Sequence, residues 1–526
     1  MTMNKMIYVL LVILVGGIVS CYDDKSKKAN REIPEVTITT DKEILEAVYG
    51  KELIVKPVIK KGDQGSANLS YQWQVNLTPR GHELMDIGEG AELIYEVANE
   101  PSGNPYLLVL KVTDNDEGID YYKMWDLYVS NSFGEGLLVA HTGNSGETSD
   151  LTFVKAPQVT YGYEEEPEYT RDIYSFANGG LIEGRVNSFV ANIATNGATY
   201  NLSRLVIGTD KEIFSVDPVT FGRTMSNEDL FFQAPTLFKV ETISTAVGNC
   251  LLTIIDGKAY GQIGNGAYQF FSPMNYAAGS TQVFNGKLAV EKTTSVMTAA
   301  FTCYDETNGY FVYGANFLVF NNGATSILTQ QLGEGQYVFD PGNLPNKKAI
   351  AAGVGNNSEH LHLLRDLNSG LDTLFKISSI SYVPGGTGKI SINECTDITQ
   401  AVDYAFCENM DVMYYATDDK IYPALLAGSS ARSGTPWNLP STGERITRVQ
   451  VYQQAWYGNS AYSSEDYEFI HAQHQKQLLV STYNSSTGEG KVYIVPITTL
   501  GTGALGEASQ ILTGFGEITA IGTTLK

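Results

Sequence analysis

The sequence has few charged residues, and fewer of them are basic than acidic. Only 18% of its 526 residues are Asp, Glu, Lys or Arg, and 35 basic side chains stand against 58 acidic ones, for a formal net charge of −23. A chain with this balance repels nucleic-acid phosphates and anionic lipid headgroups. The composition therefore argues against nucleic-acid binding, and it favours a soluble, acidic surface.

Cysteine is also scarce. Of five cysteines, Cys250, Cys303, Cys395 and Cys407 lie in the body of the chain, at spacings that match no zinc site. They could pair in an oxidising compartment. Cys395 and Cys407 are the better disulfide candidates, because a short loop between neighbouring strands could bring them together. Buried free thiols in strands are the alternative.

The chain has no apolar run of the roughly 20 residues that a membrane-spanning helix needs. Its most apolar stretch, Ile7 to Val15, follows Lys5 and leads to Ile18-Val19-Ser20-Cys21, after which the chain becomes polar. This pattern predicts a lipoprotein signal peptide over residues 1–20. We expect Cys21 to become the lipid-bearing N-terminus, which would hold the protein on a membrane surface rather than within it.

The expected location of this lipid-anchored protein is the outer membrane of a Gram-negative cell, facing the exterior. The basic and acidic residues just after Cys21 resemble the export tags of such lipoproteins. Retention on the inner leaflet is the alternative.

The remaining composition favours an all-β fold. With Gly 52, Tyr 32 and Phe 21, the chain is rich in aromatics that suit half-buried strands and in glycines that suit tight turns. A chain of 526 residues is too long for one ordinary core, so at least two domains are expected.

After a flexible tether at residues 21–33, a first domain is expected at residues 34–130. Six or seven alternating strands in this stretch predict an immunoglobulin-like β-sandwich, with Trp73 in its core and a hairpin turn at Asp114 to Gly118. The expected strands are Val36 to Ile38, Leu53 to Val55, Tyr71 to Val75, Leu93 to Tyr95, Tyr106 to Val112 and Trp125 to Val129.

Three of these segments resemble a known family. The motif Tyr71-Gln72-Trp73, the strand from Tyr106 to Asp114, and Trp125 to Val129 followed by Phe133 to Leu138 look like the PKD-like (polycystic-kidney-disease-repeat) surface lipoproteins of Gram-negative bacteria. Those proteins are encoded near TonB-dependent outer-membrane transporters. The resemblance implies an immunoglobulin-like spacer, a ligand-binding C-terminal body and a transporter partner. It implies no catalytic residue.

Residues 136–526 repeat a short apolar strand followed by a polar turn and a second strand. Unequal spacings of about 40 to 65 residues suit four-stranded blades with variable loops and predict a β-propeller of seven blades. A strand near Ile518 to Ile521 is expected to complete the first blade. The seven copies are Gly136 to Ala140, Leu205 to Asp210, Leu251 to Asp256, Ala300 to Asp305, Ile350 to Val354, Met413 to Asp418 and Leu478 to Thr482.

The sequence gives only weak evidence for catalytic or metal-binding residues. His360 and His362 would share one face of a strand, but a metal needs at least a third ligand, so they and His471 and His474 are expected to be surface groups. The chain has no Ser-x-Asp-x-Gly-x-x-Trp box and no Gly-x-Ser-x-Gly elbow. We therefore expect no metal, no cofactor and no catalytic residue, although a carboxylate pair hidden among the acidic residues stays open.

A loop-rich stretch stands out as a candidate ligand site. It sets arginines and aromatic residues among Ser, Gly, Asn and Pro, a combination that suits flat or anionic ligands. The alternative is that Trp437 and Trp456 fill hydrophobic gaps between blades. The candidate ligand-binding residues are Arg432, Trp437, Arg445, Arg448, Trp456, Tyr457 and Tyr462.

The expected function is capture of a small ligand for delivery to a TonB-dependent transporter. Arginines among the tryptophans favour a ferric siderophore, a choice that also draws on the resemblance, since some family members are regarded as iron-scavenging partners. The alternatives are a glycan-binding lipoprotein of a polysaccharide-utilisation system, a propeller enzyme acting on glycosides, and a structural or adhesive protein.

Changing Cys21→Ala should release a soluble, folded protein, because no other segment of the sequence is expected to hold a bilayer. Fractionation of cells into membrane and soluble material, with a high-salt wash, measures this. A variant that still sediments with membranes after the wash would show that the anchor lies elsewhere.

Overall fold

The structure is a computed structural model, and the all-β prediction is confirmed. Among the described residues, strands joined by turns dominate, with one short α-helix, α2 (Ile173–Asn178), and a few 3-10 turns. The structure describes residues 34–524 except 65–67, 100–103, 131–132, 144–145, 197–199, 247–249, 264–268, 271, 275–282, 293–298, 316, 321–324, 328–336, 379–383 and 456–470.

The chain divides into two units with separate cores. The first is Met1–Ser132 and the second is Phe133–Lys526. Phe133 already belongs to the second core, because its ring packs edge-on against Phe153 and Phe221, with ring centroids 5.4 and 4.8 Å apart.

The first unit contains one five-stranded sheet, ordered β2-β9-β8-β5-β6, and two strand pairs, β1-β4 and β3-β7. Strands β8 and β9 form the predicted hairpin, since β8 ends at Asp114 and Gly118 closes the turn with a positive φ. The strands are β1 (Val36–Thr39), β2 (Ile44–Val48), β3 (Glu52–Val55), β4 (Val58–Lys61), β5 (Leu69–Asn76), β6 (Leu84–Gly88), β7 (Leu93–Glu96), β8 (Tyr106–Asp114) and β9 (Ile119–Ser130).

Two stacked tryptophans form the centre of the first core. Trp73, predicted as a core residue, is fully buried, and its ring stacks on that of Trp125 with centroids 5.5 Å apart. Both indole N–H groups are satisfied, since Trp73 donates to the Gly90 carbonyl at 2.8 Å and Trp125 donates to the Lys42 carbonyl at 3.0 Å. A buried indole needs such a partner, so these bonds fix the orientation of both rings.

A buried ammonium group ties strand β4 to the β8–β9 turn. Lys61 Nζ, only 1% exposed as a residue, lies 2.7 Å from Asp114 Oδ1 and 2.6 Å from Asp116 Oδ2. The hydrogen bond to Asp114 raises the pKa of Lys61, and the same bond lowers the pKa of Asp114. The pair therefore stays charged inside the unit at neutral pH.

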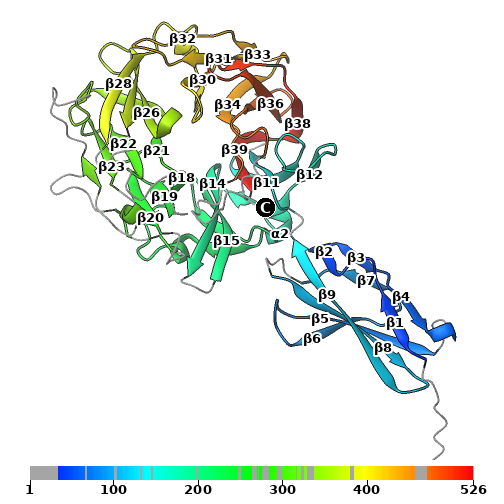
Figure 1. Cartoon of the computed structure of the whole chain (residues 1–526). Coiled ribbons are helices and arrows are strands. Elements are labelled where there is room, and N and C mark those ends of the chain that lie inside the picture. The colour runs from blue at the N-terminus through cyan, green and yellow to red at the C-terminus, as the bar shows by residue number, and fades with distance from the viewer. Residues whose placement is uncertain are drawn as a thin grey trace, which may run out of the picture. The chain divides into compact units, whose positions relative to one another are not determined.

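The second unit consists of seven successive antiparallel sheets, numbered here from 1 to 7 in chain order (Figure 1). Sheet 1 consists of β10 (Gly136–Thr142), β11 (Thr148–Lys155), β12 (Glu168–Thr170), β13 (Ile182–Glu183) and β39 (Glu517–Thr524). Sheet 2 consists of β14 (Val186–Asn196), β15 (Tyr200–Thr209), β16 (Ile213–Val216) and β17 (Arg223–Ser226). Sheet 3 consists of β18 (Val240–Ala246), β19 (Cys250–Ile255) and β20 (Lys258–Gln262).

Sheets 4 to 7 continue the same pattern. Sheet 4 consists of β21 (Leu288–Val290), β22 (Phe301–Asp305), β23 (Tyr310–Gly314) and β24 (Ser326–Ile327), and sheet 5 consists of β25 (Lys347–Val354), β26 (Glu359–Asp366), β27 (Asp372–Ser378) and β28 (Gly385–Ser391). Sheet 6 consists of β29 (Asp403–Phe406), β30 (Val412–Ala416), β31 (Lys420–Leu425), β32 (Arg432–Ser433) and β33 (Trp437–Asn438). Sheet 7 consists of β34 (Arg445–Val451), β35 (Gln477–Asn484), β36 (Glu489–Thr499), β37 (Ala504–Leu505) and β38 (Gln510–Phe515).

The end of the chain completes the sheet that begins the unit. Strand β39 pairs antiparallel with β10 over the register from Gly136↔Thr524 to Thr142↔Glu517. The sequence predicted this closing strand near Ile518 to Ile521, and the pairing confirms it. Sheet 1 therefore carries strands from both ends of the second unit (Figure 1).

A hydrophobic cluster fills the gap between each sheet and the next, including the gap between sheet 7 and sheet 1. The central strands are therefore apolar on both faces, as in β19 and β30, where every residue is buried. This explains why they appear in the sequence as continuous apolar runs rather than as alternating ones.

His360 and His362 on β26 are buried, and the prediction that they are surface groups is wrong. Both bind the hydroxyl of Thr302 on β22 at 2.8 Å, across the gap between sheets 4 and 5. Since the hydroxyl has one proton to donate, it donates to one ring and accepts from the other. Burial lowers the pKa of both imidazoles to about 3, so both are neutral at neutral pH.

Stability of the second unit should fall as the pH is lowered from 6.5 toward about 4. In this range the unfolded chain binds protons at His360 and His362 that the folded chain excludes, because the pKa values are 6.5 unfolded and about 3 folded. Changing His362→Gln should reduce the slope of the free energy of unfolding against pH by up to about 1.4 kcal/mol per pH unit. Urea unfolding at several pH values measures it.

The matched control is His82→Gln, which removes an exposed histidine of the first unit. An unchanged slope in the His362 variant would contradict the neutral, buried state of this pair.

Candidate ligand-binding site

One strand from each sheet of the second unit faces a common central pocket of about 640 Å³. These strands, β39, β14, β18, β21, β25, β29 and β34, contact one another in that order. Residues from strands far apart in sequence therefore meet in one place. The strand residues that line the pocket are Phe189, Val190, Ala191, Ile243, Ser244, Thr245, Leu288, Val290, Ala352, Gly353, Val354, Tyr404, Ala405, Phe406, Val449, Gln450, Val451, Gly522 and Thr523.

Two glycines let the pocket strands approach closely. A Cβ at Gly353 on β25 would lie 2.7 Å from the ring of Phe406 on β29, and a Cβ at Gly522 on β39 would lie 2.6 Å from the ring of Phe189 on β14. Each phenylalanine thus occupies space that a side chain on the neighbouring strand would need. This packing gives part of the pocket wall an apolar, aromatic surface.

Side chains also link neighbouring pocket strands by accepting hydrogen bonds from backbone N–H groups. A bulge between Val240 and Thr242 precedes Ile243, whose N–H donates to Ser188 Oγ at 3.2 Å. Likewise a bulge in β34 precedes Val449, whose N–H donates to Asp403 Oδ2 at 2.9 Å. Strands β18 and β34 each pair with a neighbour on one side only, so alternate N–H groups face away from that neighbour and can bind a side chain of the preceding pocket strand.

The carboxyl group of Asp403 is held in an environment that disfavours its charge. Burial raises the pKa of Asp403, and the hydrogen bond from Val449 together with the nearby Arg448 works in the opposite direction. Burial lowers the pKa of Arg448 in turn. Asp403 begins β29, whereas Tyr404 to Phe406 line the pocket, so this charged pair lies beside the pocket lining rather than within it.

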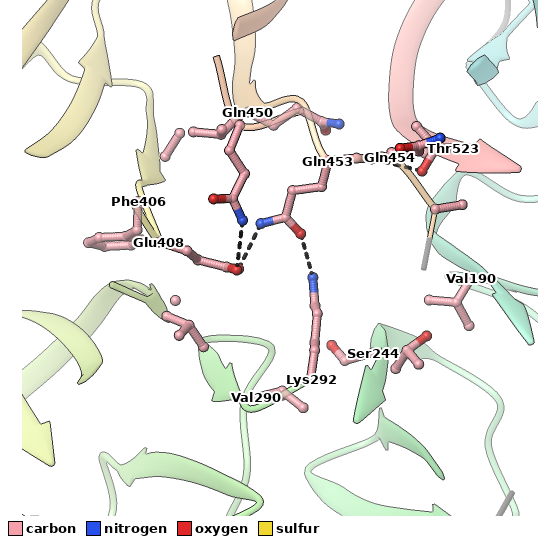
Figure 2. Close-up of a pocket in the computed structure, with 18 of the residues that line it drawn as sticks. Val190, Ser244, Val290, Lys292, Phe406, Glu408, Gln450, Gln453, Gln454 and Thr523 are labelled. Atoms are coloured by element: carbon pink, nitrogen blue, oxygen red, sulfur yellow. Dashed lines mark hydrogen bonds between the residues drawn. The ribbon is translucent and has the colours of Figure 1, made fainter. Parts of the chain in front are cut away.

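A polar bridge crosses one end of the pocket (Figure 2). Lys292 Nζ donates to Gln453 Oε1 at 3.0 Å, and Gln453 Nε2 donates to Glu408 Oε1 at 2.7 Å. Gln475 Nε2 donates to the other oxygen of Glu408 at 3.1 Å. Lys292, Glu408 and Gln453 each lie two residues after the last residue of a pocket strand, so the bridge joins sheets 4, 6 and 7. We call these four residues the polar bridge.

His474 adds a neutral imidazole beside the polar bridge. Its Nδ1 accepts the backbone N–H of Gln454 at 3.0 Å, so its proton is assigned to Nε2. Burial lowers the pKa of His474, with the nearby Glu408 acting against this effect. The Gln454 side chain is held by the N–H of His471 at 2.8 Å and by Glu135 Oε1 at 2.7 Å.

The pocket combines apolar strand residues with polar ones, among them the polar bridge at one end, as small-molecule sites commonly do. Among its lining residues, Lys292 and Glu408 are the charged ones, and their charges cancel. Over the part of the chain that the structure describes, no three His, Cys, Asp or Glu side chains lie close enough to hold a metal ion. The arrangement suits reversible binding of an uncharged molecule.

The structure separates most of the ligand-binding residues predicted from the sequence. Arg432 and Arg445 are exposed and line neither the central pocket nor the cavity beside it. Arg448 is half-buried and borders the pocket through its neighbour Val449. Trp456, Tyr457 and Tyr462 lie outside the described residues.

Trp437 is a core residue, and its predicted role in stacking on a ligand is wrong. It is 8% exposed and belongs to the hydrophobic cluster between sheets 6 and 7, where its ring packs edge-on against Tyr493 at 6.0 Å. This is the alternative that the sequence left open, in which tryptophan fills a gap between sheets.

The disulfide predicted between Cys395 and Cys407 is not formed. Both residues are buried free thiols, and they lie in different hydrophobic clusters, Cys395 between sheets 5 and 6 and Cys407 between sheets 6 and 7. Burial raises the pKa of Cys407 to about 12 and also raises that of Cys395. Thiols in such surroundings are unreactive.

Sequence reasoning missed Lys292, Glu408, Gln453 and Gln475, and it placed His471 and His474 on the surface. His471 is in fact buried, and His474 lines the pocket. The available signal is positional, because Lys292, Glu408 and Gln453 each follow a short apolar strand by two residues. That signal becomes readable only once the pocket strands are known.

The first unit and the start of the second are similar to a known protein family. Residues 21–185 match the PKD-like family. The PKD-like part of the resemblance inferred from the sequence is confirmed for this stretch. The PKD-like match extends beyond the first unit, through strands β10 to β13 of sheet 1. No curated protein matches the chain.

Several solved structures are weakly similar. A protein of unknown function from Bacteroides caccae matches 64% of this chain and 98% of its own at 7% identity, with a TM-score of 0.22. PorZ, a surface component of the type IX secretion system of Porphyromonas gingivalis, matches at 12% identity and a TM-score of 0.27 over 72% of this chain and only 52% of its own.

The extracellular domain of a putative hybrid two-component system from B. thetaiotaomicron matches 91% of this chain and 68% of its own at 8% identity, with a TM-score of 0.24. Likenesses at this level carry no functional argument.

Within the described residues, no helix has the length and apolar character needed to cross a membrane.

Changing Trp437→Ala should lower the free energy of unfolding by about 3–5 kcal/mol, because it opens a cavity between sheets 6 and 7. Changing exposed Arg432→Ala should alter it by no more than about 0.5 kcal/mol. Urea unfolding followed by intrinsic fluorescence compares the two variants. Equal stabilities would contradict the core role of Trp437.

Proposed function

We propose that the second unit is a seven-bladed β-propeller whose central pocket captures a small ligand. Seven successive sheets, seven hydrophobic clusters between them and the pairing of β39 with β10 support this architecture. The single observation that carries the function is the central pocket itself, to which every sheet contributes one strand. Its volume of about 640 Å³ suits a drug-sized molecule.

The pocket favours a ligand with no large net charge. A ferric catecholate siderophore is strongly anionic and needs an excess of Arg or Lys. In the central pocket Lys292 is matched by Glu408, and the arginines that supported a siderophore in the sequence, Arg432 and Arg445, lie outside the lining. A neutral, glycan-related ligand therefore fits the described residues better than the siderophore that the sequence favoured.

Binding without turnover is the proposed mode of action. Hydrolysis of a glycoside commonly needs two carboxyl groups flanking the bond. Among the described lining residues of the central pocket, Glu408 is the one carboxylate, and both of its oxygens accept hydrogen bonds from glutamine amides. A carboxylate held in this way is suited to positioning a ligand.

The proposed cellular role is that of a lipid-anchored outer-membrane protein on the cell surface that passes its ligand to a TonB-dependent transporter. The signal-like segment ending at Cys21 supports the anchor. The PKD-like match supports the protein class, and the transporter partner rests on the family resemblance.

Changing Ser244→Phe should weaken ligand binding at least about tenfold, because Ser244 lines the central pocket and a phenyl ring would fill part of it. Ser485→Phe, in an exposed turn between β35 and β36, is the matched control. Calorimetry with neutral oligosaccharides and with a ferric catecholate measures binding. A ligand that binds both variants equally well would place the site outside the pocket.

A further inference from the structure

A second cavity of about 330 Å³ adjoins the central pocket. We call it the side cavity. The two share Val290, Lys292, Val354, Glu408 and Gln475. The shared polar residues belong to the polar bridge, which therefore lies where the cavities meet.

The side cavity has a different chemistry from the central pocket. Its further lining residues are Glu291, Gly355 and the turn Asn356 to Ser358. Asn356 lies two residues after the pocket strand β25, the same position that Lys292, Glu408 and Gln453 hold after theirs. Amide, hydroxyl, carboxylate and ammonium groups thus converge around one small space, whereas the larger one has a mixed lining in which aliphatic and aromatic side chains such as Phe189, Leu288 and Phe406 lie beside polar ones.

The turn that lines the side cavity has a strained backbone. Asn357 and Ser358 both have φ of 56°, in the left-handed region that non-glycine residues seldom adopt. Two successive residues of this kind cost energy and persist only where the surrounding structure holds them, which is common at ligand sites. In this conformation Asn357 and Ser358 both line the side cavity.

The polar bridge has bonding capacity to spare. Lys292 is exposed, and its bond to Gln453 uses one of three ammonium donors. Each oxygen of Glu408 accepts one amide hydrogen bond and can accept another. Donors and acceptors therefore stand side by side at the junction, which is what neighbouring hydroxyl groups of a sugar ring require.

We infer that the two cavities form one site for an amphipathic glycoside, with the sugar ring in the side cavity and an apolar aglycone in the central pocket. This inference rests on the proposed function and names its ligand class. An anionic head group is disfavoured, because the side cavity has two carboxylates, Glu291 and Glu408, for one ammonium group. The mixture of donors and acceptors favours hydroxyl groups over a simple cation.

Calorimetry of the full chain with n-octyl β-D-glucoside, below its micelle concentration, tests the inference. Methyl β-D-glucoside should bind at least about a hundredfold more weakly, since it lacks the apolar chain. Octanoate and octyltrimethylammonium, which keep the chain but change the head group, should bind at least about tenfold more weakly.

Asn357→Gly provides the matched variant, because glycine accepts the left-handed backbone while the amide is lost. This variant should bind octyl glucoside about three- to tenfold more weakly and should bind octanoate as tightly as the unaltered chain does. Asn346→Gly, at another left-handed asparagine with φ of 56° outside both cavities, should change neither.

The outcomes separate the two proposals. If octanoate or octyltrimethylammonium binds more tightly than octyl glucoside, the sugar assignment is wrong. If that binding is lost in Ser244→Phe, the central pocket remains the site. Octyl glucoside binding that survives Ser244→Phe would overturn both. No binding of octyl glucoside to the unaltered chain would overturn the glycoside assignment.

Discussion

Burial of apolar side chains between neighbouring sheets is the interaction on which the second unit depends. No sheet there has a core of its own, because each hydrophobic cluster takes residues from two sheets. A sheet in such an arrangement is stable only when both of its neighbours are present. Sheets 1 and 7 also have two neighbours each, because residues of sheet 7, such as Leu479, share a hydrophobic cluster with residues of sheet 1, such as Val139. The pocket strands are held in place as a consequence.

The same burial explains how much of the fold the sequence predicted. A strand covered on both faces is a continuous apolar run, and six of the seven predicted copies lie on the strand that pairs with the pocket strand of their sheet. The fifth copy, Ile350 to Val354, is instead the first strand of sheet 5. The strand equivalent to the others is β26, where His360 and His362 interrupt the apolar pattern. Their burial depends on Thr302, which is distant in sequence, so the pattern alone could not have shown it.

The candidate site was harder to predict because it belongs to no single segment. Each pocket strand contributes only two or three small or apolar residues, such as Ala352 and Gly353, which look like ordinary strand residues. Trp437 and the arginines were predicted as ligand-binding residues because of their residue type. Whether a residue can bind a ligand also depends on its solvent exposure and on its position relative to the pocket. The side chains that meet at the polar bridge come from three sheets, and their common position after a strand becomes visible only with the topology known.

The pairing of β39 with β10 has a consequence for folding. The two strands lie at opposite ends of the second unit in sequence, so sheet 1 reaches its full width only when segments distant along the chain meet. Until then β10 lacks a partner along one edge, and such an edge is open to pairing with other chains. Because pairings between distant segments form slowly, we expect the unit to be most prone to aggregation before β39 is in place.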